Sequence, residues 1–196
     1  MNPKCIAIDI DGCICDFAHA VSKILHDINP IYPVFNDNSE AKKWQQWYDN
    51  NPTISDEDWA TAWNTVYTKE NLLSMKAMPH ARKALKELNS LKNKYKIYFV
   101  TMRKPLNGYS IQDISVEWIE SKGYKKPSVV ITKEKEKFAE IAYVTHFLED
   151  CPKMLDKLST VKDLKVYKCS AGYNKECFGI PVKNSLEFID IIKKEE

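Results

Sequence analysis

Apolar residues recur along the chain with two periods, one typical of strands and one typical of helices. Short apolar runs rich in β-branched and aromatic residues predict buried strands of a parallel sheet. Apolar residues spaced three or four apart, as at Phe17, Val21 and Ile24, predict amphipathic helices between these runs. The predicted strands are 5–8, 95–100, 128–131, 145–148 and 164–169; the predicted helices are 17–28, 79–91, 111–121, 138–143, 152–158 and a last one capped by Asn184.

This alternation of strands and helices predicts the α/β fold class, with a parallel sheet that carries helices on both faces. Residues 17–76 show no strand pattern, and we interpret them as a small helical cap inserted after the first strand. Residues 1–16 and 77–196 would then form the core that contains the sheet. The cap would cover the carboxyl end of the first strand, where open α/β sheets bind their ligands.

Aromatic residues are concentrated in the cap. Trp44 and Trp47 fall on one face of a predicted helix, and Trp59 and Trp63 fall on one face of a second helix with Ser55 as its N-cap. Aromatic stripes of this kind usually form the core of a small helical unit, which is the interpretation that we favour. The alternative is that some of these rings stack on a ligand.

The charge and hydrophobicity of the chain argue against a long nucleic acid or a membrane as its partner. The chain carries 29 basic and 27 acidic side chains, a formal net charge of +2, which argues against a surface dedicated to a long nucleic acid. No apolar run approaches the roughly 20 residues that span a bilayer. Because the sequence runs from Met1 into the first predicted strand without room for a signal peptide, we expect a cytoplasmic protein with no membrane partner. Formation of a homodimer is left open.

The six cysteines form no Cys-x-x-Cys pair, which favours a reduced protein over a disulfide scaffold. Cys13, Cys15 and Cys151 flank acidic residues, so a site for a soft metal has to be considered. Carboxylates select hard cations, however, and buried thiols behave as small apolar groups. We therefore interpret these cysteines as packing residues.

Two carboxylates, Asp9 and Asp11, directly follow the first predicted strand, and Gly12 then permits a tight turn. In an extended chain, alternate side chains point the same way, so both acids should approach one ligand while Ile10 enters the core. Two like charges at close range require a cation or a proton. A simple turn is the alternative interpretation, since Asp and Gly are common turn residues.

Chemically functional side chains also follow three other predicted strands. The carboxyl ends of parallel strands meet at one edge of the sheet, so these groups should converge there. Carboxylates, a hydroxyl and cations at one edge describe a site for Mg²⁺ and a phosphate group. Each residue alone is more simply a turn or surface residue, and their coincidence carries the prediction. They are Thr101 and Arg103, Lys133 and Lys135, and Glu149 and Asp150.

This set of residues resembles the four motifs of the haloacid-dehalogenase-like (HAD) phosphatase superfamily, which has a Rossmannoid parallel sheet. More closely, the chain resembles the 5′(3′)-deoxyribonucleotidase family. Segments 9–17, 97–103, 131–135 and 172–174 carry the resemblance, whereas residues from about 29 to 76 are similar only in being helical and aromatic. The resemblance implies a Mg²⁺-dependent phosphomonoester hydrolase, most simply a nucleotidase that acts on deoxynucleoside or nucleoside monophosphates.

The resemblance also implies roles for the acidic residues. Asp9 would be the nucleophile that forms an aspartyl-phosphate, and Asp11 would be the general acid and then the general base. Mg²⁺ would bind Asp9, the backbone carbonyl of Asp11, and Asp150. Glu149 would orient a metal-bound water.

For phosphate and substrate, the resemblance implies a second group of residues. Thr101 and Lys135 would hold the phosphoryl oxygens, and Lys137 is the alternative to Lys135 because it also lies near the start of the next helix. Arg103 would bind substrate phosphate or support the residues that do. Phe17 matches the aromatic residue after the first motif and could stack on a nucleobase, with Trp44 and Trp47 as further substrate-binding candidates.

Other functions are compatible with part of this pattern. The same superfamily chemistry could act on a phosphosugar or a nucleic-acid 3′-phosphate. A non-catalytic module could bind a nucleotide or a protein through the aromatic cap, but it would not need the full set of acids with Thr101 and a lysine. A phospho-acceptor receiver module fits less well, because simple phospho-acceptance does not require Asp11.

Overall fold

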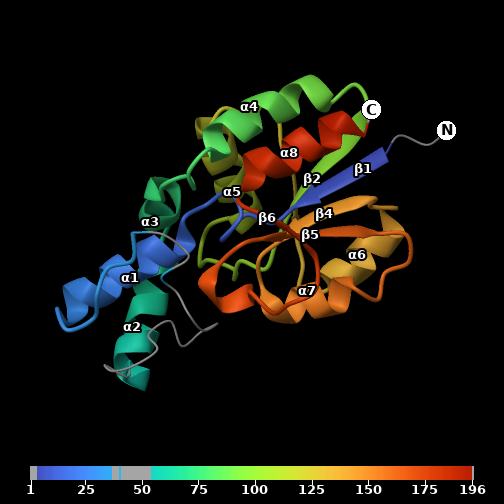
Figure 1. Ribbon diagram of the computed structural model, residues 1–196. Helices are drawn as coiled ribbons and strands as arrows, with labels where there is room; N and C mark the ends of the chain where they lie inside the picture. The colour runs from blue at the N-terminus through green and yellow to red at the C-terminus, as the bar shows by residue number, and fades with distance from the viewer. Residues whose placement is uncertain (1–3, 37–39, 41–53, 196) are drawn as a thin grey trace.

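The computed structural model describes residues 4–36, 40 and 54–195. Six strands form one parallel sheet in the order β3-β2-β1-β4-β5-β6, with helices on both faces (Figure 1), which confirms the predicted α/β fold class. The strands are β1 (Lys4–Ile8), β2 (Tyr95–Thr101), β3 (Ser128–Ile131), β4 (His146–Glu149), β5 (Lys165–Cys169) and β6 (Ile180–Val182). The helices are α1 (Phe17–Ile28), α2 (Asp56–Val66), α3 (Lys69–Ser74), α4 (Ala81–Leu91), α5 (Ile111–Ser121), α6 (Lys135–Ile141), α7 (Pro152–Leu158) and α8 (Ser185–Lys194), with a 3-10 turn at Gly172–Asn174.

The sheet separates two apolar layers, and β1 contributes to both. Ile6 and Ile8 belong to the larger layer, which contains the buried faces of α4, α5 and α8. Cys5 and Ala7 belong to the smaller layer, with α6 and α7. Alternate residues of a strand point to opposite faces, so an unbroken apolar run is what a strand buried on both sides requires.

Most predicted elements occur within one or two residues of their expected bounds, and the differences have local causes. Helix α4 begins at Ala81 rather than at Pro79, because His80 has a φ of 65° and cannot continue a helix. Helix α6 begins at Lys135, three residues before the predicted start at Phe138. Helix α3 and strand β6 were not predicted; β6 is a three-residue edge strand that contains Pro181, and so short a strand has little sequence signal.

The first three helices lie together beside the carboxyl end of the sheet (Figure 1). Ser55 caps α2 by accepting a hydrogen bond from the backbone N–H of Asp58 at 3.1 Å, as predicted. The predicted helix that contains Trp44 and Trp47 lies outside the described residues.

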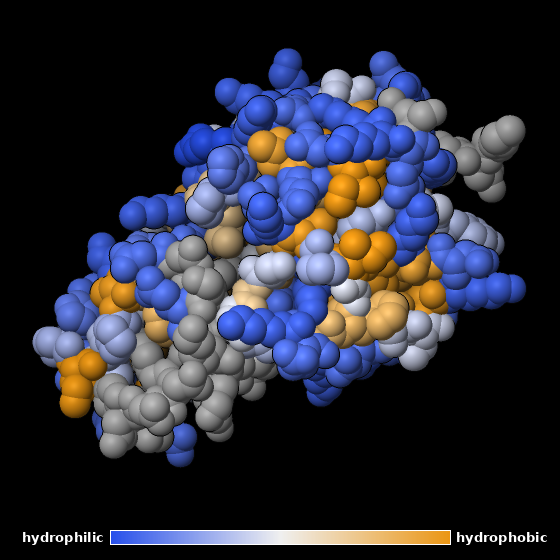
Figure 2. Space-filling model, viewed as in Figure 1, coloured by the Kyte–Doolittle hydropathy of each residue, from blue (hydrophilic) through white to orange (hydrophobic). Residues whose placement is uncertain are grey.

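The outer surface of the fold is mixed in character. Figure 2 shows hydrophilic side chains over most of the viewed face, with smaller apolar areas between them. Among the described residues, no helix has the length and apolar character needed to cross a membrane.

Candidate active site

The carboxyl end of the sheet brings three of the predicted strand ends together. β1 pairs with β2 on one side, with Ile8 opposite Phe99, and with β4 on the other, with Ile8 opposite Leu148. Asp9 continues this pairing, because its backbone N–H donates to the carbonyl of Leu148 at 2.9 Å. The residues that follow these strands are therefore neighbours in space.

Asp9 is buried and lies against a buried lysine. Its Oδ1 is 2.8 Å from Nζ of Lys135 and also accepts a hydrogen bond from the backbone N–H of Ile10 at 2.8 Å. Burial raises the pKa of Asp9 well above its ordinary value, and the nearby Glu149 carboxylate raises it further, while Lys135 opposes both effects. The site thus holds excess negative charge that a bound cation would neutralise.

Lys135 joins two carboxylates. Besides Asp9, its Nζ contacts Oε2 of Glu149 at 2.7 Å, and the lysine is only 1% exposed. Burial alone would lower the pKa of Lys135, but the two carboxylates raise it above its usual range, so the lysine stays charged. Lys137 is exposed and pairs with Glu134. The structure therefore places Lys135 in the site and Lys137 on the surface.

Glu149 uses both carboxylate oxygens within the protein. Oε2 accepts the hydrogen bond from Lys135, and Oε1 accepts the backbone N–H groups of Asp150 and Cys151, each at 3.0 Å. This arrangement fixes the lysine and the chain that follows β4. The expected role of Glu149 in orienting a metal-bound water stays a prediction.

Asp150 is held by a second set of residues. Its Oδ2 accepts a hydrogen bond from the Tyr173 hydroxyl, and Asn174 donates through Nδ2 to its backbone carbonyl at 2.8 Å. Gly12 lies directly against this carboxylate: a Cβ at Gly12, whose φ is +84°, would be 2.0 Å from Oδ2. Burial, then the Glu149 charge, raises the pKa of Asp150 well above its ordinary value.

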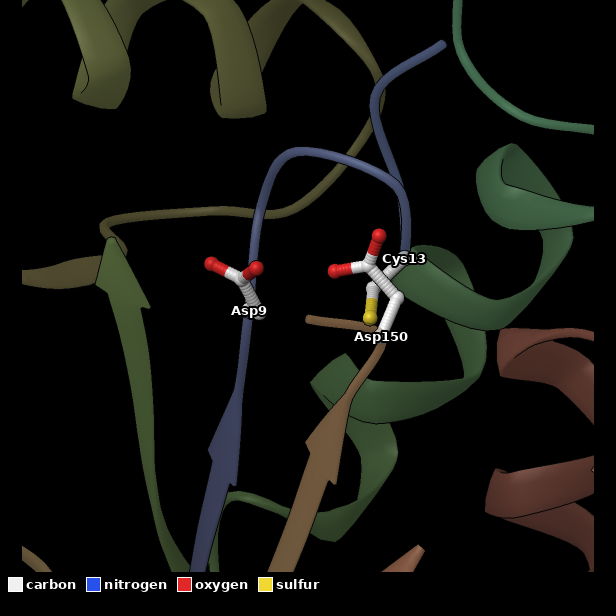
Figure 3. Close-up of side chains that lie close together, drawn as sticks. All are labelled: Asp9, Cys13 and Asp150. Atoms are coloured by element: carbon white, nitrogen blue, oxygen red, sulfur yellow. The ribbon is translucent and has the colours of Figure 1, made fainter. Parts of the chain in front are cut away.

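The buried acids form a cluster with metal-ligand geometry. A carboxylate oxygen of Asp9, a carboxylate oxygen of Asp150 and Sγ of Cys13 all lie within 4.8 Å of one another (Figure 3). Oδ1 of Asp150 is buried and has no hydrogen-bond partner among the described residues. Buried polar atoms are normally paired, so this oxygen and the surplus negative charge fit a divalent cation.

Asp11 has a different partner from Asp9. The buried guanidinium of Arg103 donates from Nη2 to Oδ1 at 2.7 Å and from Nε to Oδ2 at 3.0 Å. A further hydrogen bond from Nη1 to Ser115 Oγ, at 3.3 Å, fixes the guanidinium against α5. Arg103, which the sequence suggested for phosphate binding or support, therefore holds the carboxylate of Asp11.

The remaining predicted phosphate ligands occupy different environments. Thr101 is 1% exposed at the end of β2, and its carbonyl accepts the backbone N–H of Thr132 at 2.9 Å. Lys133 is exposed. Thr101 thus lies at the sheet edge with the acids, whereas Lys133 lies on the surface.

A cavity of about 490 Å³ lies between the cap and the loop after β2. Trp63 and Tyr67 line it from the cap, and Lys104 lines it from the loop, with its Nζ 5.3 Å from the centre of the Trp63 ring. Phe17 packs behind these aromatic residues, with its ring centre 5.5 Å from that of Trp63. Tyr67 also lies near Asp11: burial raises the pKa of the Tyr67 hydroxyl, and the negative charge of Asp11 raises it further. Tyr67 therefore lies both in the cavity wall and close to the acids. Trp44 and Trp47 lie outside the described residues.

Sequence reasoning did not assign several residues that build the site. Tyr173 and Asn174 fall in a segment that carried the family resemblance, but no pattern connected them to Asp150. Ser115 sits on the predicted helix 111–121 and only the fold shows that it contacts Arg103. The aromatic helical face that the sequence predicts includes Trp63, and the structure places this ring in the wall of the cavity together with Tyr67, four residues on.

Solved structures of hydrolases, several of them described as HAD-superfamily or haloacid-dehalogenase-like, match nearly the whole chain. A predicted phosphoglycolate phosphatase from Haemophilus somnus 129PT has a TM-score of 0.54 and 17% identity, covering 98% of this chain and 99% of that chain. A subfamily IA, variant 1 HAD hydrolase from Geobacter sulfurreducens PCA has a TM-score of 0.53 and 16% identity, covering 97% and 96%. A hydrolase from Pseudomonas syringae has a TM-score of 0.55 and 14% identity, covering 98% and 99%. The fold is therefore that of the HAD superfamily.

The family follows from the sequence of the chain itself. The profile of the family described as 5′ nucleotidase, deoxy (pyrimidine), cytosolic type C matches residues 3–179, and the chain belongs to this family. No curated protein sequence matches the chain. The protein is a phosphomonoester hydrolase of nucleotidase type, which confirms the predicted class of enzyme and its small phosphomonoester substrate. Hydrolases of this superfamily generally use a divalent metal.

Proposed function

We propose that this protein is a Mg²⁺-dependent nucleotidase that hydrolyses deoxynucleoside monophosphates through an aspartyl-phosphate on Asp9. The observation that carries the proposal is the buried Asp9 carboxylate, which lies between Lys135 and the Asp150 carboxylate at the carboxyl end of the sheet. Asp9 is thereby held beside the Lys135 ammonium group, and it also belongs to the acidic cluster that suits a divalent metal ion. Such an arrangement suits a carboxylate that must accept a dianionic phosphoryl group.

In the first step, a carboxylate oxygen of Asp9 attacks phosphorus. A new oxygen–phosphorus bond forms as the bond between phosphorus and the sugar oxygen breaks. Lys135 and Thr101 would bind the phosphoryl oxygens, and the positive charge of Lys135 offsets negative charge in the transition state. Glu149 keeps the lysine oriented through its 2.7 Å contact.

Asp11 would move the protons. It gives a proton to the sugar oxygen as that group leaves, and it then takes a proton from the water that attacks the aspartyl-phosphate. The second step releases inorganic phosphate and restores the Asp9 carboxylate. Arg103 holds Asp11 at two points, so its role in this scheme is to position the acid rather than to bind phosphate.

The acidic cluster supports Mg²⁺ as the cofactor. Asp9, Asp150 and the backbone carbonyl of Asp11 would hold the ion, since hard cations prefer oxygen ligands. When bound, Mg²⁺ would supply positive charge that neutralises the phosphoryl oxygens and reduces the repulsion between the carboxylates. The unpaired Oδ1 of Asp150 supports this assignment.

The cavity beside the cap supports a nucleotide as the substrate. Its aromatic rings, Trp63 and Tyr67, offer apolar surface to a base, and Lys104 offers positive charge at the same wall. We assign residues 17–76 as the specificity-determining cap and residues 1–16 and 77–196 as the catalytic core. The family description also supports a cytosolic location.

The experiment is a phosphate-release assay on a panel of substrates. The panel contains deoxynucleoside 5′- and 3′-monophosphates, a phosphosugar and an oligonucleotide 3′-phosphate, each assayed with Mg²⁺ and with EDTA. We expect Mg²⁺-dependent release that is fastest with a deoxynucleoside monophosphate and is abolished in Asp9→Asn. Release that EDTA does not reduce, or an active Asp9→Asn variant, would contradict the mechanism. If release were fastest with the phosphosugar or with the oligonucleotide 3′-phosphate, that compound class would replace deoxynucleoside monophosphates as the proposed substrate.

A further inference from the structure

Cys13 lies among the acids that would hold the activating metal. Its Sγ and one carboxylate oxygen each of Asp9 and Asp150 are within 4.8 Å of one another, and all three residues are buried. Figure 3 shows the sulfur next to the Asp150 carboxylate, which is directed toward Asp9. This is the only such group of three metal-ligating side chains among the residues that the structure describes.

A second observation also points to a ligand. Asp150 is 2% exposed, and its Oδ2 accepts a hydrogen bond from Tyr173, but its Oδ1 has no hydrogen-bond partner among the described residues. An unpaired buried carboxylate oxygen costs free energy unless a cation or a proton satisfies it. Asp150 belongs to the same cluster as the thiol, so a cation bound at its carboxylate would lie close to sulfur.

Cys169 lies beside Cys13 and is not one of the three clustered ligands. The two other cysteines that flank the acidic motifs in the sequence are arranged differently. Sγ of Cys15 lies 3.4 Å from Sδ of Met75. Cys151 is the N-cap residue that precedes α7, and its backbone N–H donates to Glu149. Neither belongs to the three-residue cluster. The interpretation of the cysteines as packing residues therefore does not describe Cys13 fully.

We propose that a thiophilic divalent cation, Zn²⁺ or Cd²⁺, binds to Cys13 Sγ together with the carboxylates of Asp9 and Asp150 and displaces the activating Mg²⁺. Oxygen ligands alone favour hard cations, whereas a thiolate adds affinity for soft ones. Binding releases the thiol proton to solvent and transfers no electron. The displacement rests on the proposed function, because it uses the same carboxylates, but the binding itself is measurable without substrate.

The experiment titrates Co²⁺ into the metal-free, full-length protein and records thiolate-to-cobalt charge-transfer absorption. We expect the band in the wild type and its loss in Cys13→Ser. Cys15→Ser and Cys177→Ser are the matched controls and should keep the band; Cys177 is a partly exposed free thiol outside the cluster. Because loss of even an outer-shell partner costs about 10- to 100-fold in metal affinity, Cd²⁺ affinity by calorimetry should fall at least tenfold in Cys13→Ser.

Two further measurements make the outcome decisive. Cadmium NMR of the wild type should report a sulfur ligand, which tests the proposal even if Cys13→Ser does not fold. With Mg²⁺ present, the Zn²⁺ concentration that halves phosphate release should rise at least about tenfold in that variant. Co²⁺ binding without the band, or a band that persists in Cys13→Ser, overturns the proposal. Absence of Mg²⁺-dependent activity together with an intact band instead contradicts the proposed function and leaves the thiophilic site standing.

Discussion

Arg103 holds the carboxylate of Asp11 at two points, with Nη2 2.7 Å from Oδ1 and Nε 3.0 Å from Oδ2. The guanidinium is itself fixed by Ser115 and is fully buried. Bidentate contacts of this kind set the orientation of a carboxylate as well as its position. An acid that must deliver a proton to a leaving group benefits from both constraints.

Arg103→Lys tests whether this residue positions the acid or binds phosphate. Lysine keeps the charge but cannot make the two-point contact. We expect kcat to fall by about 100-fold, the lower end of the roughly 100- to 10,000-fold that general acid–base catalysis contributes, with little change in KM. With p-nitrophenyl phosphate, whose leaving group needs no proton, the loss should be smaller. Arg82→Lys, at an exposed position of α4, is the control; a rise in KM without a fall in kcat would instead indicate phosphate binding.

Lys135 and Lys137 provide a matched pair of substitutions. Lys135→Met leaves the buried carboxylates of Asp9 and Glu149 without their shared cation, and breaking a buried pair costs about 3–5 kcal/mol. We expect urea denaturation of the metal-free protein to show a loss of this size, together with loss of phosphate release. Lys137→Met removes an exposed pair with Glu134, which water and salt screen, and should leave stability nearly unchanged. Equal effects of the two changes would contradict the assignment of Lys135.

The ends of the predicted strands account for most residues of the candidate site, because groups that follow neighbouring parallel strands lie at the same end of the sheet. Asp9 and Asp150 are neighbours because β1 pairs directly with β4, with Ile8 opposite Leu148. Local sequence pattern carries no information on strand order, so it could list these groups but could not say which of them touch. That information belongs to tertiary packing.

Side-chain direction explains what the sequence could not decide. Lys135 and Lys137 are both close to the start of α6, and only the packing of the helix on the sheet turns Lys135 inward. Arg103 follows β2 as expected, but its partner is Asp11 because the guanidinium reaches across to the β1 turn. The strand β6 was not predicted, because a strand of three residues that includes a proline shows too little alternation of apolar and polar residues.

Gly12→Ala should disable the acidic cluster. A methyl group at this position would lie 2.0 Å from Oδ2 of Asp150, and the φ of +84° adds backbone strain. We expect the Mg²⁺ concentration needed for half-maximal activity to rise at least about tenfold, the size that disturbance of ligand support produces. Gly108→Ala has a similar φ of +77° but meets no atom within 4 Å, so it isolates the backbone effect. Unchanged Mg²⁺ dependence in Gly12→Ala would contradict the assigned metal site.

Trp63→Ala tests the cavity as the nucleobase site. Stacking of a base on an aromatic ring contributes about 1–3 kcal/mol, so KM for a deoxynucleoside monophosphate should rise by roughly 5- to 150-fold. Turnover of β-glycerophosphate, which has no base, should change little and serves as the control substrate. Because Trp63 also packs on Phe17, circular dichroism must show that the variant folds. A similar loss with both substrates would indicate that Trp63 only supports the cap.

Glu195→Gln should remove a stabilising contribution that depends on pH. Hydrogen bonds from Lys165 at 2.8 Å and from His146 at 3.0 Å, together with their charges, lower the pKa of Glu195 from its usual 4.5 to about 2. A carboxyl group with a lowered folded-state pKa stabilises the fold above its unfolded pKa, and this contribution is lost as pH falls from about 4.5 toward about 2. Because the group is partly exposed, we expect the variant to lose about 1 kcal/mol or less in urea denaturation at pH 7, and less still at pH 3. Glu176→Gln, an exposed control, should show no such difference between the two pH values; an effect of Glu195→Gln that grows on acidification would contradict the sign of this linkage.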